Sequence, residues 1–243
     1  MIKFFRHIRQ QMIKENRVSK YLLYAIGEIV LVMIGILLAL QVNTWNKGRE
    51  RSGQERKMLR ELVVNLRADS LDHAENMDWY VNGQTSAAMV VSTLEARSPW
   101  NDSMAVHYGW LFTHGMATLN TSAYDNLKSI GFDLISNDSI RIALTNLHGL
   151  DYARLHKAEQ EFAADFSNLT VWPMLLKRLK MDRWWHATPL DYTALLDDLE
   201  FREVVRFRGI TMGYMKNQCN GTLKNTSDLI AMIERELDRQ KDQ

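Results

Sequence analysis

Two groups of carboxylate and histidine side chains have a spacing that suits metal binding or acid–base chemistry. The first group is expected on one face of a helix and consists of Asp69, Asp72 and His73. The second group covers two helical turns and consists of His148, Asp151 and His156. A carboxylate–histidine pair binds a metal only with further ligands. The sequence supplies no second ligand set, so the commoner interpretation is a solvated helix face. We predict no metal ion and no cofactor.

Familiar catalytic motifs are missing from the sequence. It contains no H-E-x-x-H, no G-x-S-x-G, no phosphate-binding loop and no C-x-x-C-H haem site. The single cysteine, Cys219, excludes an intramolecular disulfide and a cysteine-based zinc site within one chain. We therefore predict a protein that acts without catalysis. The rival interpretation is a hydrolase or metal enzyme that lacks a familiar motif.

The most unusual ionisable residue is Glu28, which interrupts the apolar run of residues 21–42. As a helix this run covers roughly 33 Å, enough to cross the hydrocarbon core of a bilayer. A carboxylate inside the bilayer costs about 2.5–3.5 kcal/mol on insertion scales. No cation lies within one helical turn of Glu28 in the sequence. We expect Glu28 to be protonated, or satisfied by a group outside its own helix.

Gly35 and Ala39 lie on the same helical face as Glu28. Their small-xxx-small spacing lets two transmembrane helices approach closely. One interpretation is therefore a self-associating helix in which Glu28 forms a hydrogen bond across the interface. A second is a proton or ion path through Glu28 in an assembly with another membrane protein. A third is a protonated side chain with no further role.

A tryptophan-rich stretch, residues 171–190, has the most unusual local composition outside the apolar run. Its tryptophans, Trp172, Trp184 and Trp185, lie among the cations Lys177, Arg178, Lys180 and Arg183. Aromatic rings next to cations suit lipid headgroups, a glycan or a groove on a partner. The alternative is that the tryptophans pack inside a helical bundle while the bases face water, which is the commoner arrangement in all-α domains.

The membrane segment divides the chain into three parts: residues 1–18, 19–45 and 46–243. Residues 19–45 are predicted as an uncleaved transmembrane helix, because the apolar run exceeds a signal peptide's and no A-x-A cleavage site follows it. Six Lys/Arg lie in the 20 residues on each side, so charge does not decide the orientation. Long domains translocate largely regardless of charge. We therefore expect residues 1–18 in the cytoplasm and residues 46–243 outside it, in the periplasm of a bacterium.

Residues 1–18 are predicted to form a basic amphipathic helix in the plane of the headgroups. An apolar face holds Phe4, Phe5 and Ile8, with Lys3 and Arg6 opposite. Residues 1–50 carry eight Lys/Arg against three Glu, a pattern of attraction to anionic lipids and not to nucleic acid. The alternative is a disordered basic flank. The predicted partners are the lipid bilayer and a sister chain or another membrane protein, with no nucleic acid.

Residues 46–243 are predicted to be all-α, as an elongated antiparallel helical bundle. Apolar residues recur at helical spacing, and no two-residue alternation indicates a strand. One long helix is expected from about residue 53 to Arg97, before Ser98-Pro99. A short helix should end at Gly131, and Asn137 or Asp138 should begin the next. The last helices are expected at residues 195–215 and 227–240.

Two stretches resemble a family of uncharacterised single-pass membrane proteins from Bacteroidota. The N-terminal match is IKFFRHIRQ followed by ENRVSKYLLYAIGEIVLVMIGILLALQVNTWN, and the second is YDNLKSIGFDLISNDSIR at residues 124–141. Together they cover about a quarter of the chain. The resemblance implies a bacterial source, a single membrane span and a Gly27–Glu28 pair that belongs to the family pattern. It implies no specific activity.

These observations lead to one functional hypothesis and one rival. The first is a single-pass inner-membrane protein with a helical periplasmic interaction domain, oligomeric, that acts as a scaffold, sensor or regulator of an envelope complex. The rival is a component of a proton- or ion-driven membrane assembly that uses Glu28.

Overall fold

The computed structural model describes residues 18–241 and divides into two compact units, Met1–Gln54 (unit 1) and Glu55–Gln243 (unit 2). The division falls within α2, a continuous helix over Val18–Glu95. The predicted interfacial helix lies outside the described residues, except for Val18. The prediction of an all-α chain is confirmed, because almost all regular structure is helical. The finer expectation of an antiparallel bundle stays a prediction.

In unit 1, α2 presents apolar side chains to its surroundings. Every residue from 29 to 50 is exposed. The most apolar window has a mean hydropathy of 2.4, and none of it is buried. Exposing such a surface to water costs about 25 cal/mol per Å² of apolar area. Among residues 18–241, this is the one helix long and apolar enough to cross a membrane.

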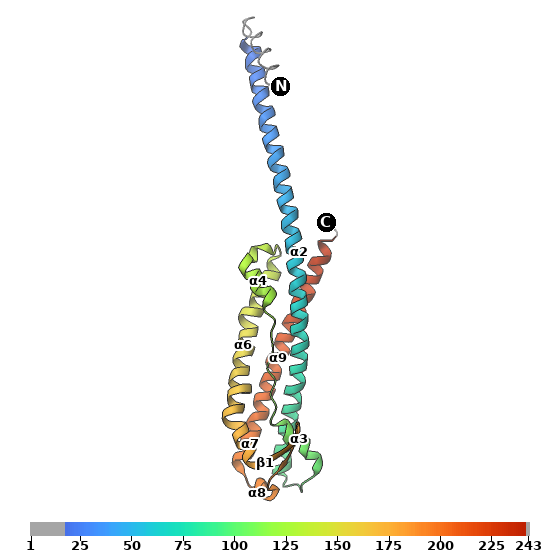
Figure 1. Cartoon of the computed structure of the whole chain (residues 1–243), viewed down its shortest axis with the longest axis vertical. Coiled ribbons are helices and arrows are strands. Elements are labelled where there is room, and N and C mark those ends of the chain that lie inside the picture. The colour runs from blue at the N-terminus through green and yellow to red at the C-terminus, as the bar shows by residue number, and fades with distance from the viewer. Residues whose placement is uncertain (1–17, 242–243) are drawn as a thin grey trace. The chain divides into compact units, whose positions relative to one another are not determined.

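Unit 2 contains the rest of α2, a series of shorter helices, one hairpin and a long final helix (Figure 1). In chain order the elements after α2 are η1 (Asp102–Met104), α3 (Ala105–Trp110), α4 (Ser122–Ile130), η2 (Phe132–Leu134), α5 (Asp138–Asn146), η3 (Leu147–Asp151), α6 (Tyr152–Ala158), η4 (Glu159–Asp165), η5 (Ser167–Val171), α7 (Trp172–Arg178), β1 (Leu179–Arg183), β2 (His186–Pro189), α8 (Tyr192–Leu196) and α9 (Leu199–Arg239). The elements η1 and η2 are 3-10 helices, whereas η3, η4 and η5 are π-helical stretches.

Three long helical rods carry the core of unit 2: α2 from residue 55, the nearly continuous run from α5 to α7, and α9. Figure 1 shows α9 running in the opposite direction to α2. Buried side chains from these rods form three clusters along their length. The first contains Leu59 and Ile233, the middle one Tyr80 and Met212, and the last Phe201. The middle cluster is the smallest, and polar side chains fill the core beside it.

Several helix ends lie where the sequence predicts them. The long helix ends at Glu95, close to the expected stop before Ser98-Pro99. The helix α4 ends before Gly131, whose φ of +116° suits glycine. Asn137 caps α5, and its side chain accepts hydrogen bonds from the backbone N–H groups of Ser139 and Ile140. Local capping chemistry therefore determines these boundaries.

The prediction of two separate helices at residues 195–215 and 227–240 is wrong. The helix α9 continues unbroken from Leu199 to Arg239. The polar stretch between the two predicted helices looks like a break, but Cys219, Thr222 and Thr226 in it are buried at helical spacing. These small polar side chains continue the buried stripe beside the polar part of the core.

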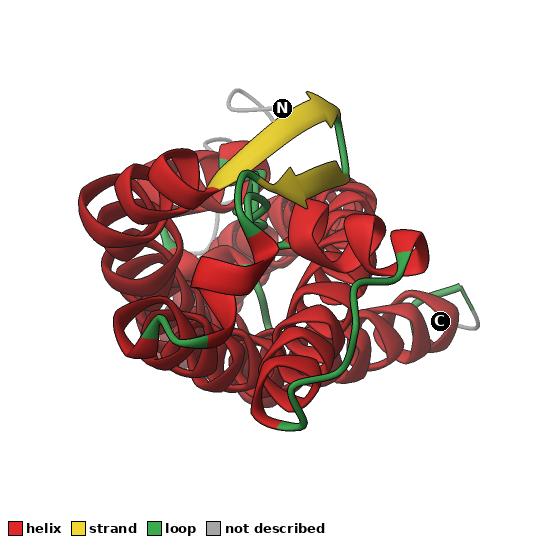
Figure 2. Cartoon of the chain, turned by 90° about the horizontal axis from the view of Figure 1, so that it is seen from below, coloured by secondary structure: helices red, strands yellow, loops and turns green. Residues whose placement is uncertain are grey.

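The sequence predicted no strand, and this is also wrong. β1 and β2 pair antiparallel, with a register shift between Met181 and Arg183, and their turn consists of Trp184 and Trp185. Figure 2 shows the two strands at the edge of the group of helices. The strand β2 packs on α3 at Gly109, where a Cβ atom would lie only 2.1 Å from the carbonyl carbon of Trp185. The hairpin therefore depends on contact with a distant helix.

Candidate binding site

An aromatic pocket lies in unit 2 among α2, α7, the hairpin turn and the segment that follows α3. Its volume is about 330 Å³, and its lining consists of Trp79, Phe112, Thr113, His114, Trp172, Trp184 and Trp185. The structure thus brings together the three tryptophans that the sequence singled out. Sequence reasoning missed Trp79 and His114 as members of this site, because no local pattern links them to residues 171–190.

Ring-to-ring contacts hold the walls of the pocket. Trp79 and Trp110 meet edge to face with ring centroids 5.6 Å apart, and each lies about as close to Trp185, at 5.9 and 6.0 Å. On another side, the rings of His114 and Trp172 are 5.4 Å apart. Each such aromatic pair contributes about 0.5–1.5 kcal/mol beyond its buried area. The rings therefore form two groups in contact, one on each side of the pocket.

The backbone also positions the aromatic side chains. The indole N–H of Trp172 donates to the carbonyl oxygen of Phe112 at 2.9 Å. Trp185 has a φ of +58°, a left-handed conformation that is uncommon for a bulky residue and often marks functional sites. The neighbouring Trp184 side chain is 74% exposed, which is unusual for such a large apolar group. The hairpin turn thus places one ring in the wall and one at the rim.

A buried cation lies next to the pocket wall. The Arg208 side chain is 1% exposed, and its guanidinium donates to Ser167 Oγ and to the carbonyl oxygen of Thr113, a residue of the lining. Burial lowers the pKa of Arg208 to about 10, so the group stays charged at neutral pH. No carboxylate of the described chain forms an ion pair with it. Burial, and then the charge of Arg208, lowers the pKa of His114.

Of the four cations near the tryptophans in the sequence, two form ion pairs with carboxylates. Arg178 pairs with Asp198 and Glu200, and Lys180 pairs with Asp182 at 2.9 Å. Lys177 and Arg183 are exposed, and neither forms an ion pair within residues 18–241. Lys177, Lys180 and Arg183 therefore face water, as one of the two sequence interpretations proposed, whereas Arg178 is only partly exposed and the tryptophans line a hollow.

A segment without regular structure, residues 113–121, crosses unit 2 from the pocket to α4; we name it the strap. Side chains of α2 and η4 satisfy its backbone. The N–H groups of Ala117, Thr118 and Asn120 donate to carboxylates of Glu159, Asp72 and Asp69, at 2.9, 3.0 and 2.7 Å. The Tyr80 hydroxyl donates to the carbonyl oxygen of Gly115 and to Glu159, each at 3.1 Å. The strap is therefore bound much as an extended peptide is bound in a groove.

The interpretation of Asp69, Asp72 and His73 as a solvated face is wrong. Asp69 and His73 are fully buried, and Asp69 also accepts a hydrogen bond from the Tyr152 hydroxyl at 2.7 Å. Burial raises the pKa of Asp69 above its ordinary value, although these hydrogen bonds act in the opposite direction. Burial likewise raises the pKa of Glu159. The carboxylates of Asp69 and Asp72 thus accept hydrogen bonds from the backbone of the strap.

No metal centre emerges from these side chains in the part of the chain that the structure describes. No group of three or more His, Cys, Asp or Glu there is arranged to hold an ion. His73 lies beside Cys219, whose thiol donates to the His73 carbonyl oxygen at 3.3 Å. Burial raises the pKa of the Cys219 thiol to about 12, so it remains protonated and unreactive at neutral pH.

The fold gives separate surroundings to His148, Asp151 and His156, the second group of the sequence analysis. His148 stacks on Tyr124 with ring centroids 3.9 Å apart, and burial lowers its pKa to about 4. Asp151 accepts a hydrogen bond from Asn225 at 2.8 Å, and His156 is exposed. The structure therefore gives these three residues no common chemistry.

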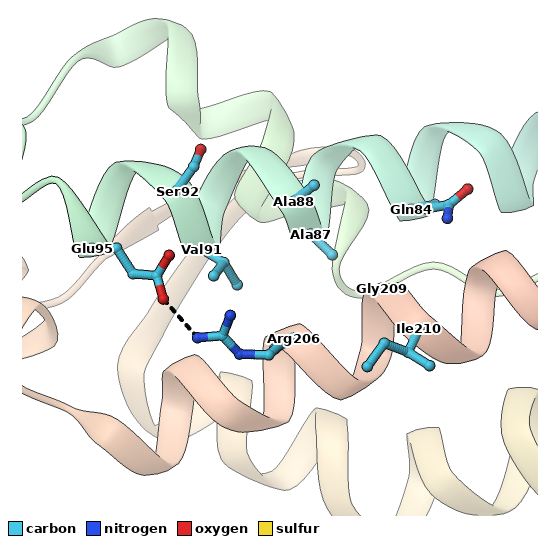
Figure 3. A pocket seen from close by; sticks show the side chains of 9 residues that line it. All are labelled: Gln84, Ala87, Ala88, Val91, Ser92, Glu95, Arg206, Gly209 and Ile210. Carbon is cyan, nitrogen blue, oxygen red and sulfur yellow. Dashed lines mark hydrogen bonds and ion pairs between the residues drawn. The ribbon is translucent and has the colours of Figure 1, made fainter.

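A second hollow lies between α2 and α9, and small residues keep it open. Ala87, Ala88 and Gly209 form its floor, and a Cβ atom at Gly209 would lie 3.1 Å from that of Ala87. An ion pair between Glu95 and Arg206, 2.7 Å long, closes one end (Figure 3). None of the unpaired buried polar atoms of the described chain belongs to its lining, and we assign the hollow to close helix packing.

Glu28, Gly35 and Ala39, the three residues that the sequence analysis selected in the apolar run, lie on α2 in unit 1. Gly35 and Ala39 are exposed, and a Cβ atom at Gly35 would meet nothing within 4 Å. Glu28 is half-buried, unlike the exposed residues on either side of it. The shared face is thus open at Gly35 and Ala39.

No family model matches the chain, and neither a curated protein nor a solved structure is significantly similar to it.

Proposed function

We propose that the chain is a single-pass protein of a bacterial inner membrane whose extramembrane unit recognises an apolar group through the aromatic pocket. In this role it acts as a sensor or regulator of an envelope complex. The observation that carries the proposal is the pocket itself. Four tryptophans, from α2, α7 and the hairpin turn, line one hollow, and one of them is largely exposed. Tryptophan is enriched where proteins bind partners.

The membrane part of the proposal is supported by α2. Its apolar side chains in residues 29–42 are exposed, and the window is apolar enough for a bilayer. We place the N-terminus in the cytoplasm and unit 2 in the periplasm, because a long domain translocates more readily than a short basic tail. The resemblance to membrane proteins of Bacteroidota supports the same assignment.

We further propose that the span associates with a second copy of itself. Support comes from the open face at Gly35 and Ala39 and from Glu28, which would form a hydrogen bond across the interface. Cysteines placed at Gly35 or Ala39, with Cys219→Ala removing the native thiol, should give oxidised dimers in native membranes. Leu37→Cys, on the opposite side of the helix, is the matched control. Equal dimer yields at all positions would contradict a defined interface.

Recognition through the pocket is tested by comparing two exposed apolar positions of unit 2. Trp184 at the pocket rim is 74% exposed, and Leu199 away from the lining is 64% exposed. Full-length wild type, Trp184→Ala and Leu199→Ala are purified from crosslinked cells, and the bound molecules are quantified by mass spectrometry. We expect a reproducible set that is lost with Trp184→Ala and kept with Leu199→Ala. Identical sets from all three chains would refute recognition at the pocket.

A further inference from the structure

The unused polar groups of the pocket lining indicate what kind of ligand fits. Two carbonyl oxygens on the wall already have donors: that of Phe112 accepts from Trp172, and that of Thr113 accepts from Arg208. The Thr113 hydroxyl donates to the carbonyl oxygen of Trp110 at 2.7 Å. No carboxylate or amide side chain belongs to the lining. The wall therefore offers a ligand few acceptors.

Donors, by contrast, remain available. Within residues 18–241, the indole N–H groups of Trp79, Trp184 and Trp185 donate to no protein acceptor. The Nδ1 atom of His114 is buried and has no partner in the same part of the chain. A neutral imidazole can donate from this nitrogen. A ligand that accepts hydrogen bonds would satisfy these groups.

Charge acts in the same direction. Arg208 is a buried cation without a carboxylate partner, and its Nε atom is one of the unpaired buried atoms. Its guanidinium donates to the carbonyl oxygen of Thr113, so Arg208 contacts the pocket lining without belonging to it. Burying an unpaired charge is costly, and an anion in the adjacent hollow would offset part of that cost.

Two other ligand classes fit less well. Ring faces attract organic cations, but the lining has no carboxylate and Arg208 repels positive charge. A sugar offers several hydroxyl donors, and the lining would leave them without acceptors. An apolar body with an acceptor group at one end matches both the rings and the donors.

We propose that the aromatic pocket binds an apolar monocarboxylate, with its carbon skeleton among the indole rings and its carboxylate toward the donors and Arg208. The volume of about 330 Å³ is at the small end for a ligand pocket, which suits a single ring system or a short chain. The inference rests on the proposed function, because it names the ligand class of the same pocket.

The test uses three probes with one ring system and different charges: 1-naphthylacetate, 1-naphthylacetamide and 1-naphthylmethylammonium. Each is titrated calorimetrically at neutral pH into the full chain in lipid nanodiscs, with empty nanodiscs as the blank. We expect the carboxylate to bind at least about tenfold more tightly than the amide, as a desolvated charge pair allows, and the ammonium to bind most weakly. Trp79→Leu should weaken all binding, whereas Trp45→Leu in unit 1 should change nothing.

Arg208→Met tests the charge while keeping the side-chain volume. If the variant folds, it should bind the carboxylate and the amide equally; if it does not fold, the wild-type ratio alone decides. Equal binding of carboxylate and amide by the wild type, or tightest binding of the ammonium, would overturn the ligand class and leave recognition of apolar groups standing. Binding of none of the three probes would also overturn it. The co-purification comparison of Trp184→Ala and Leu199→Ala then judges the proposed function separately.

Discussion

Replacing Gly109 by alanine should push the tryptophan turn off α3 and dismantle the aromatic pocket. The new Cβ atom would lie 2.1 Å from the carbonyl carbon of Trp185 and 2.3 Å from the backbone nitrogen of His186. Ordinary van der Waals contact begins at 3.4 Å. Both obstructing atoms belong to the backbone, so no rotation of a side chain relieves the contact. The turn itself has to move.

The cost follows from the kind of clash. Overpacking of a filled core costs about 1–3 kcal/mol, and a backbone obstruction belongs at the upper end, about 2–3 kcal/mol. For a unit of this size, each kcal/mol lowers the unfolding midpoint by about 2–4 °C. We therefore expect Gly109→Ala to lower the Tm of unit 2 by roughly 4–12 °C. Binding of the naphthyl probes should weaken in parallel, because Trp184 and Trp185 leave their positions.

The assay is thermal unfolding of the full chain in nanodiscs, followed by circular dichroism and tryptophan fluorescence. Gly221→Ala is the matched control, because Gly221 lies in α9 and a Cβ atom there would meet nothing within 4 Å. Alanine in an exposed helical position stabilises by about 0.5–1 kcal/mol relative to glycine. A Gly109→Ala chain with unchanged Tm and unchanged probe binding would refute the account of how the hairpin is held.

Three further predictions concern buried or embedded polar groups. His148 is held neutral by burial, so its contribution of about 3 kcal/mol is present above pH 6.5 and is lost as the pH falls toward about 4; His148→Phe should reduce this acid sensitivity in urea titrations, with the exposed substitution His156→Phe as the control. Asp69→Ala should lower the unfolding free energy by about 2–4 kcal/mol, because two donors lose their buried acceptor; a smaller loss than that of Thr121→Ala, an exposed strap residue, would contradict it. Glu28→Gln should keep the oxidised dimers of Gly35→Cys, because it retains a hydrogen-bonding group, and their loss would show that the carboxyl group is needed.

Much of the fold could be predicted from local sequence signals. The end of α2 near Ser98-Pro99, the stop at Gly131 and the cap at Asn137 depend on residues within one helical turn. The break expected within α9 was wrong for a physical reason. Thr222 and Thr226 are polar, which predicts surface residues, yet both are buried beside other polar side chains of the core. At these positions a polar side chain therefore does not indicate exposure to water.

The candidate site could be predicted only in part. Trp172, Trp184 and Trp185 were found through composition, but the hollow they share depends on Trp79, more than ninety positions earlier in the chain. The hairpin was missed because its stability comes from the contact with Gly109 and not from its own short strands. The burial of Asp69 and the partial burial of Asp72 were missed because the strap that needs their carboxylates begins about forty residues later. Contacts between distant segments leave no local pattern.

The proposed location of unit 2 outside the cytoplasm, on a single membrane span, is tested most directly by thiol accessibility. The probe is Ser103→Cys, an exposed position of unit 2, in a chain whose own buried thiol is removed by Cys219→Ala. A membrane-impermeant maleimide is added to cells with a permeabilised outer membrane and an intact inner membrane. We predict labelling before the inner membrane is broken, with the chain retained in the membrane fraction after an alkaline wash. Labelling only after lysis, or release of the chain by the wash, would contradict the account.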